Sequence, residues 1–224
     1  MRLAVVQHCL RPTSDEDLRA LRDAVASAAR SGAEAVIVPD LPALRDHPDP
    51  AGWRPVEDAA GAARLIVAHV PPGQTHALIE QAGIGTVALV AGDGVIDPAE
   101  MGRVMAERPD VLILMPRSES DLQAEAFMEL ALGYSGSVAA LVVVVEPDGA
   151  EVGAPGHGGS ALIHLGAVVT EAHSGDDVLL AEVEMPPGPP EPRTALPDVP
   201  PILLQRLAVH AGRKLDVGYP ADLD

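Results

Sequence analysis

A buried strand, a glycine turn, a helix and a second buried strand follow one another between residues 85 and 116, and this order constrains the fold more than any other feature. Residues 86–91 (TVALVA) and 111–115 (VLILM) are short continuous apolar runs, which are typical of strands covered on both faces of a parallel sheet. Asp97-Pro98 predicts the helix start between them, and Gly92-Asp93-Gly94 predicts a sharp turn. Since α/β proteins often place their reactive groups at the carboxyl ends of strands, we expect a site at this turn.

A second unit of the same kind opens the chain. Residues 3–7 predict a strand, the capping box Thr13-Ser-Asp-Glu16 predicts a helix start, and residues 35–38 predict a parallel strand that ends at Pro39-Asp40. Residues 41–61 contain four prolines and are expected to be irregular. The same patterns predict strands at residues 65–70, 77–81, 138–145, 160–165, 168–172 and 178–184, and helices at residues 120–132 and 201–209.

Three segments resemble the nitrilase (carbon–nitrogen hydrolase) superfamily. Residues 3–40 are similar to the opening of that family, which ends in Pro-Glu, and residues 85–116 are similar to its nucleophile segment. Gly158-Gly159-Ser160, with Ile163 and Gly166, resembles a late Gly-Gly-Ser strand of the family. The resemblance implies an α/β fold for residues 1–185, namely an α-β-β-α sandwich. It also implies that the Pro-rich residues 186–224 form a C-terminal tail that contacts a second subunit.

The family's catalytic triad does not carry over to this sequence. Enzymes of the family use Glu as base, Lys as electrostatic support and Cys as nucleophile, whereas Asp40 stands at the Glu position and Gly92 at the Cys position. The Lys has no counterpart, because the only lysine of the chain is Lys214 in the tail. The interval from Asp40 to Gly92 is also shorter than in the family, so the fold is expected to be shortened between the second strand and the nucleophile strand. Covalent thioester chemistry needs a thiolate, which Gly92 cannot supply.

Three carboxylates remain candidates for catalysis, and each has a structural alternative. Asp40 is a surviving base or pocket ligand, or else a solvated turn residue at the edge of the sheet. Asp93 holds a water or a substrate amine, or else caps its turn through backbone amides. Glu129 aligns loosely with a structural glutamate of the family and joins an apolar helix face by its spacing, so it is a site carboxylate or a buried structural one. Gly92 and His157, the latter in a glycine-rich loop, are candidates for substrate binding.

Other chemistries find less support in the sequence. Cys9 is the only cysteine, which excludes an internal disulfide and leaves either a relocated nucleophile or a packing role. The eight histidines show no HxH or HxxxH spacing, so we expect neither a metal site nor a cofactor. The net charge of −18 argues against binding to nucleic acid or to an anionic membrane. The sequence shows no secretory signal, and we expect a cytoplasmic protein.

Two functions follow from this pattern, and a third is weaker. The first is a nitrilase-like protein that has lost cysteine-dependent amidase chemistry and acts as a non-catalytic binding protein, either as a homodimer or as the partner of an active nitrilase-like chain. The second is a rewired hydrolase of the same fold that acts on a small amide, nitrile or amine, with Asp40 or Glu129 as base. The third is a purely structural assembly protein.

Overall fold

The computed structural model describes residues 1–41, 54–139, 141–149, 152–154, 156–184 and 195–210. The strands are β1 (Arg2–Gln7), β2 (Ala35–Pro39), β3 (Arg64–Ala68), β4 (His76–Gln81), β5 (Gly85–Ala91), β6 (Val111–Met115), β7 (Leu141–Val144), β8 (Ala161–His164), β9 (Ala167–Glu171) and β10 (Asp177–Glu182). The helices are α1 (Ser14–Arg30), α3 (Arg54–Ala60), the short 3₁₀ helix η1 (Gly92–Ile96), α4 (Pro98–Ala106), α5 (Asp121–Ser137) and α6 (Pro201–His210).

The strands form two sheets that pack face to face. One sheet has the order β10-β1-β2-β3 and the other the order β4-β5-β6-β7-β8-β9. Strands β1, β2 and β3 are parallel, as are β5, β6 and β7, whereas β10, β4, β8 and β9 pair antiparallel with their neighbours. Both predicted strand–helix–strand units therefore form parallel pairs, one in each sheet.

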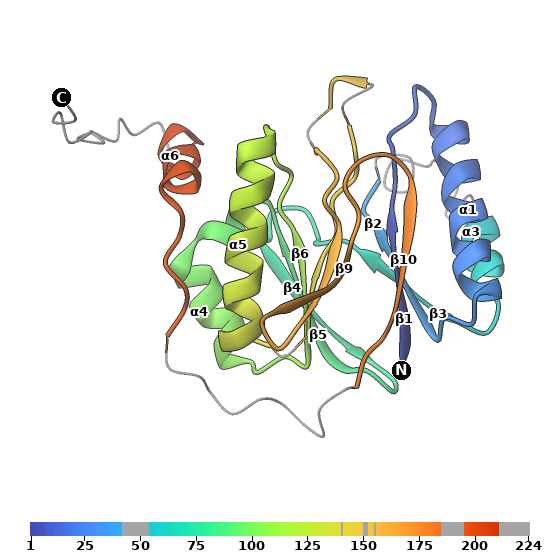
Figure 1. Cartoon of the computed structure of the whole chain (residues 1–224), viewed down its shortest axis with the longest axis horizontal. Helices are drawn as coiled ribbons and strands as arrows, with labels where there is room; N and C mark the ends of the chain where they lie inside the picture. The colour runs from blue at the N-terminus through green and yellow to red at the C-terminus, as the bar shows by residue number, and fades with distance from the viewer. Residues whose placement is uncertain (42–53, 140, 150–151, 155, 185–194, 211–224) are drawn as a thin grey trace, which may run out of the picture.

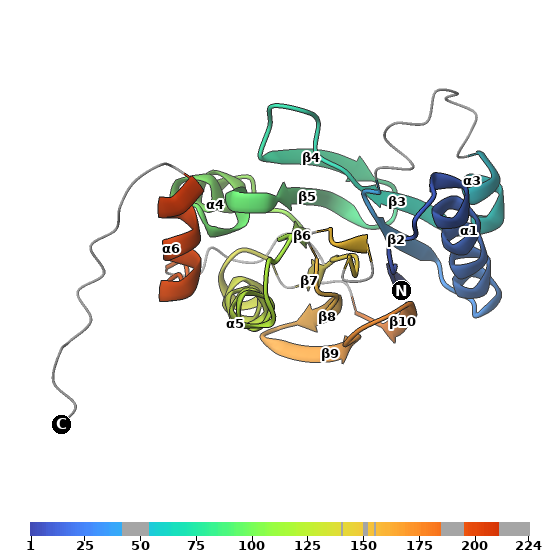
Figure 2. The same cartoon turned by 90° about the horizontal axis from the view of Figure 1, so that it is seen from above.

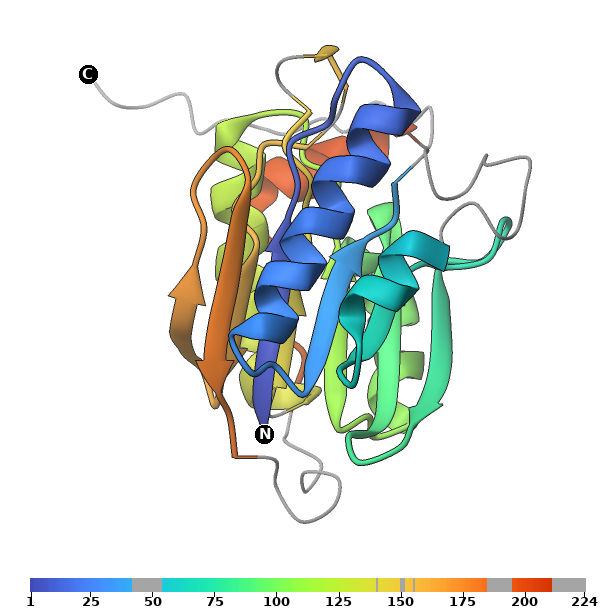
Figure 3. The same ribbon diagram turned by 90° about the vertical axis from the view of Figure 1, so that its right-hand side faces the viewer.

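Alternation of side chains along the strands produces three apolar layers. On β6, Val111 and Ile113 face the other sheet, while Leu112 and Leu114 face the helices. On β1, Leu3 faces the other sheet in the same way. Helices α4, α5 and α6 cover the six-stranded sheet, and α1 and α3 cover the four-stranded one (Figures 1 and 2). Figure 3 shows α1 and α3 lying across the outer face of their sheet. The molecule thus has the expected α-β-β-α layers.

The caps of the helices match the sequence signals. Thr13 accepts a hydrogen bond from the backbone N–H of Glu16 at the start of α1, and Asp97 accepts one from the N–H of Ala99 at the start of α4. Ser120 caps α5 through the N–H of Gln123. Each cap satisfies one of the amides that a helix start leaves without an internal partner.

The structure corrects three details of the sequence prediction. Residues 41–61 are not irregular throughout, because α3 lies within them; residues 42–53 are outside the described part. The strand predicted at residues 65–70 ends earlier, because β3 spans Arg64–Ala68, and it lies in a different sheet from β4. The predicted strand 138–145 is shorter, because α5 continues to Ser137 and β7 begins at Leu141. Apolar runs alone did not mark where that helix ends.

The C-terminal helix packs on its own chain. In α6, Leu203 is fully buried in the layer between the helices and the six-stranded sheet, and Arg206 is 7% exposed. Pro197 lies against Gly133 of α5, where an added Cβ would come within 2.6 Å of the proline ring. Residues 195–210 therefore belong to the globular unit, and contact of the tail with a second subunit stays a prediction. Within the described residues no helix is long and apolar enough to cross a membrane.

This packing predicts a difference between two adjacent leucines. Leu203→Ala removes a buried side chain and is expected to lower the free energy of unfolding by about 2–4 kcal/mol. Leu204→Ala, in which the altered side chain is 41% exposed, is the matched control and is expected to cost less than about 1 kcal/mol. Urea denaturation followed by circular dichroism measures both. Equal, small effects would mean that α6 does not pack on its own chain in solution.

Candidate functional site

A pocket opens at the carboxyl ends of the parallel strands, between the two sheets. Its volume is about 280 Å³. It is lined by residues that follow or end β2, β3, β5, β6 and β7: Pro39, Asp40, His69, Val70, Pro71, Pro72, Gly73, Gln74, Ala91, Gly92, Met115, Arg117, Val145 and Pro147. Both positions that the sequence aligned with the family's base and nucleophile, Asp40 and Gly92, lie in this one pocket. Shape and location make it the candidate site.

Three ionisable side chains line the described part of the pocket. The Nδ1 atom of His69 lies 3.3 Å from Oδ2 of Asp40, and Nη2 of Arg117 lies 3.9 Å from the same oxygen. The Asp40 side chain is 13% exposed, whereas those of His69 and Arg117 are 39% and 51% exposed. Asp40 is therefore the inner group of the three, and the two basic side chains stand nearer the solvent.

The glycine turn leaves room at the place of the nucleophile. Gly92 has φ +54°, and a Cβ built on it would have no atom within 4 Å. A side chain would fit there, at the cost of a left-handed backbone that L residues avoid. The neighbouring Asp93 turns to α6: its carboxylate accepts a hydrogen bond from Nε of Arg206 at 3.0 Å and lies 2.7 Å from Nδ1 of His210. Asp93 therefore supports the turn and does not line the pocket.

The segment that carries Arg117 is held from several sides. Arg117 has φ +55°, an uncommon conformation for a residue with a Cβ. The Arg206 guanidinium donates to the carbonyl oxygens of Arg117 at 2.8 Å and Pro116 at 3.3 Å. The backbone N–H and hydroxyl of Ser118 both donate to the buried Glu146 carboxylate. Strain of this kind persists only where the surroundings fix the backbone, and these bonds supply that constraint.

Glu146 and His157 belong to a second pocket, next to α5. It has a volume of about 290 Å³ and is lined by both residues together with Asp121. Burial raises the pKa of the Glu146 carboxyl, and the hydrogen bonds from Ser118 act in the opposite direction. His157 lies 3.1 Å, measured from Nδ1, from the Asp121 carboxylate. The two binding candidates from the sequence, Gly92 and His157, are therefore not brought together.

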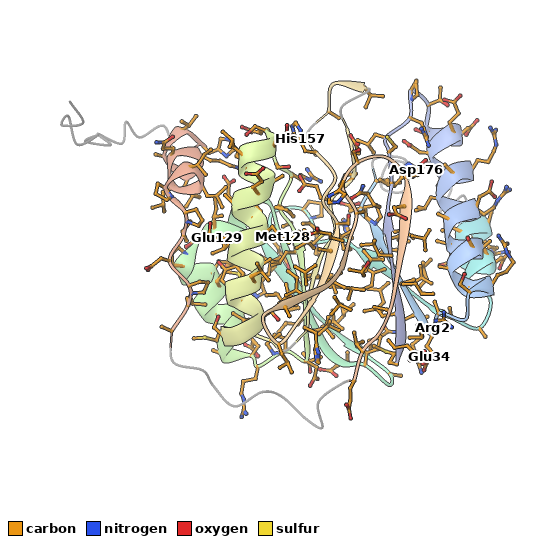
Figure 4. The ribbon with its side chains drawn as sticks, in the orientation of Figure 1. Arg2, Glu34, Met128, Glu129, His157 and Asp176 are labelled. Atoms are coloured by element: carbon orange, nitrogen blue, oxygen red, sulfur yellow. The ribbon has the colours of Figure 1, made fainter. Side chains whose placement is uncertain are left out.

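The remaining candidates lie away from the first pocket. Glu129 is exposed on the outside of α5 (Figure 4), so the apolar face assigned to it was wrong; the buried side of that helix carries Phe127, Leu130 and Tyr134 instead. Cys9 is 6% exposed and lines neither pocket. Lys214 lies outside the described residues. Among the residues that the structure describes, no three His, Cys, Asp or Glu side chains gather in a way that could hold a metal ion.

Sequence reasoning missed His69, Arg117 and Arg206. His69 follows β3 directly and Arg117 comes two residues after β6, so the rule that singled out Asp40 and Gly92 applies to them equally. Arg206 lies 113 positions from Asp93, and no local pattern indicates that contact.

Glu100 of α4 fixes the loop that forms one wall of the pocket. It is 3% exposed and accepts hydrogen bonds from Thr75 and, at 2.6 Å, from His76, and it pairs with Arg103. Burial by itself would raise the pKa of this carboxyl. The hydrogen bonds from Thr75 and His76 and the charges of His76 and Arg103 outweigh burial and lower the pKa from its ordinary value of 4.5.

This balance predicts a pH-dependent stability. A lowered pKa in the folded state stabilises the protein above pH 4.5, and the contribution is lost as the pH falls through the lowered pKa. Glu100→Gln is expected to reduce the free energy of unfolding by about 1–3 kcal/mol at pH 7, with a difference from wild type that shrinks below pH 4.5. Glu107→Gln, exposed just after the same helix, is the control. If the difference in unfolding free energy between Glu100→Gln and wild type did not change with pH, the lowered pKa of Glu100 would be contradicted.

Comparison with known proteins identifies the fold. No family model matches the sequence, and no curated protein matches it. An amidase from Nesterenkonia sp. AN1 superposes with a TM-score of 0.65 at 16% identity, over 82% of this chain and 93% of the amidase chain. One of its mutants, with the acetamide moiety of fluoroacetamide added covalently to the active-site cysteine, gives the same score and identity over 82% and 90%.

A double mutant of the same amidase in complex with acrylamide superposes with a TM-score of 0.62 at 16% identity, over 95% of this chain and 96% of that one. A further mutant structure assigns this amidase to the nitrilase superfamily. The likeness confirms the fold expected from the sequence: the chain has the α-β-β-α fold of nitrilase-superfamily amidases.

Proposed function

We propose that this protein has lost cysteine-dependent amidase chemistry and uses the pocket at the strand ends to bind a small molecule. The observation that carries the proposal is the pocket itself, which is present with Asp40, His69 and Arg117 around it although glycine stands where the nucleophile is expected. None of its described lining residues is Cys, Ser, Thr or Lys. The covalent intermediate of such an enzyme needs a nucleophile of that kind, and binding does not.

The proposal extends to assembly in the cytoplasm as a homodimer, or beside an active nitrilase-like chain. Apolar side chains are exposed on the outer helix layer, where Leu122, Leu204 and Val209 are 64%, 41% and 74% exposed. Contact with a second copy of this chain would cover them. Native mass spectrometry of the protein purified from its own host distinguishes the homodimer from a complex with another chain.

A second candidate function is a hydrolase that acts without a covalent intermediate, and the Asp40–His69 contact favours it. With Asp40 orienting the ring, His69 would take a proton from water as the water oxygen bonds to the acyl carbon of an amide. The same proton would pass to the nitrogen as the C–N bond breaks, which yields a carboxylic acid and ammonia or an amine. Asp40 keeps a role in this scheme, whereas Glu129 lies outside the pocket.

Ammonia release separates the two candidates. Acrylamide and butyramide are suitable test compounds, because structures of mutants of the Nesterenkonia amidase hold one or the other. We expect no release above the buffer rate. Release that falls at least tenfold in both Asp40→Asn and His69→Gln, but not in His173→Gln, whose side chain is exposed and lies outside this pocket, would establish the hydrolase instead.

A cysteine at position 92 tests whether a side chain there would be accessible. Gly92→Cys places a thiol in open space, so we expect it to take up one alkyl group from iodoacetamide under native conditions, measured by intact mass. Wild type, with only the buried Cys9, is the control and should remain unmodified. We expect no amidase activity from the variant, because the described residues that line the pocket include no lysine. An unreactive thiol would contradict the orientation of this turn.

A further inference from the structure

The pocket is less acidic than the chain as a whole. The chain has 15 Lys and Arg side chains against 33 Asp and Glu, whereas the described lining of this pocket has one of each kind, Arg117 and Asp40, with His69 beside them. In a strongly acidic protein, such a place offers an anion a favourable position that most of the surface does not.

Arg117 retains the geometry to bind an anion. Its guanidinium carries five N–H donors, and the contact with Asp40, at 3.9 Å, is longer than a hydrogen bond. Its side chain is 51% exposed and lines the pocket. A planar guanidinium matches a carboxylate with two parallel hydrogen bonds, so the group in the pocket best suited to Arg117 is a carboxylate.

The backbone of Arg117 is held in a conformation that stability alone does not favour. Its φ of +55° is strained, and Arg206 and Glu146 fix the residues on either side of it through hydrogen bonds. The carbonyl of Ser118 also accepts from the N–H of Gly156 at 2.9 Å. A segment fixed in this way holds the base of the Arg117 side chain in place before any ligand arrives, which reduces the entropy lost on binding.

The rest of the lining describes the body of the ligand. Four prolines, two valines and Met115 are half of the described lining residues, and such side chains suit an aliphatic chain. The volume of about 280 Å³ lies just below the range for pockets that hold drug-sized ligands. The ligand is therefore small, with an apolar chain behind its charged group.

We infer that the pocket binds a small aliphatic carboxylate, with the carboxylate on Arg117 beside His69 and the chain against the prolines. This inference rests on the proposed binding function and names its ligand class. In the complex, the ligand replaces water around the exposed guanidinium and leaves the Asp40–His69 contact intact.

Three probes of nearly equal shape test which ligand charge the pocket prefers. Butyrate, butyramide and n-butylamine are titrated into the full-length protein and binding is measured by isothermal titration calorimetry at pH 7. We expect butyrate to bind at least about tenfold more tightly than butyramide, which corresponds to about 1.4 kcal/mol, and butylamine to bind more weakly than either. Inorganic phosphate, which lacks a chain, is expected to bind more weakly than butyrate.

Arginine variants assign the preference to one residue. Arg117→Met should reduce the ratio of butyrate to butyramide affinity to about one, and Arg117→Gly should do so while the thermal midpoint stays equal or rises, because glycine relieves the strain. Arg108→Met is the matched control, since Arg108 also has a positive φ, +53°, and is exposed outside the pocket. It should leave the ratio unchanged.

The outcomes separate this inference from the function on which it rests. Equal or tighter binding of butyramide without ammonia release overturns the carboxylate inference and leaves a binding protein. A butyrate preference that survives in Arg117→Met, or the absence of any binding by the probes, also overturns it. If phosphate bound as tightly as butyrate, the pocket would be a site for anions in general, and the inferred preference for an aliphatic carboxylate would be overturned. Release of ammonia from butyramide overturns the proposed function instead, and the affinity ratio in Arg117→Met still decides the ligand class.

Discussion

The apolar layer between the two sheets fixes where this protein can do any chemistry. Side chains such as Leu3 and Ile113 meet in that layer, and each fully buried residue of this size contributes about 1.5–3 kcal/mol. The opposite faces of β1 and β6 are covered by helices, so neither face of these two central strands is open to a ligand. The carboxyl ends of the parallel strands remain, and five of them converge on the one pocket that contains Asp40 and Gly92.

Arg206 connects this pocket to the C-terminal helix. Its side chain is 5% exposed. The guanidinium lies over the ring of Phe127 and donates to Asp93 and to the carbonyls of Pro116 and Arg117. A buried charge is tolerated only with such partners, because removing it from water is costly. The same bonds join the turn after β5 to the segment after β6. A helix that the sequence placed in a tail is thus part of the frame of the site.

Sequence patterns predicted the strands, the helix caps and the positions of Asp40 and Gly92, because each depends on local residue order. They did not predict that His69 and Arg117 meet Asp40, since that depends on how the loops after three strands converge. The prediction that Glu129 joins an apolar helix face was wrong for a different reason. The apolar residues of α5 do not keep to one face, so helical spacing did not distinguish its buried side, with Phe127 and Leu130, from its exposed side, with Leu122 and Glu129.

The arrangement around Asp40 bears on the choice between binding and turnover. A hydrolase gains rate only from contacts that are stronger in the transition state than in the bound substrate or product. Arg117 is placed to hold a carboxylate, which is the product of amide hydrolysis, and its segment is fixed before the ligand arrives. Such a contact stabilises the product and slows its release. Without a nucleophile at Gly92 to offset that effect, the same geometry suits a receptor for small acids better than a catalyst that makes them.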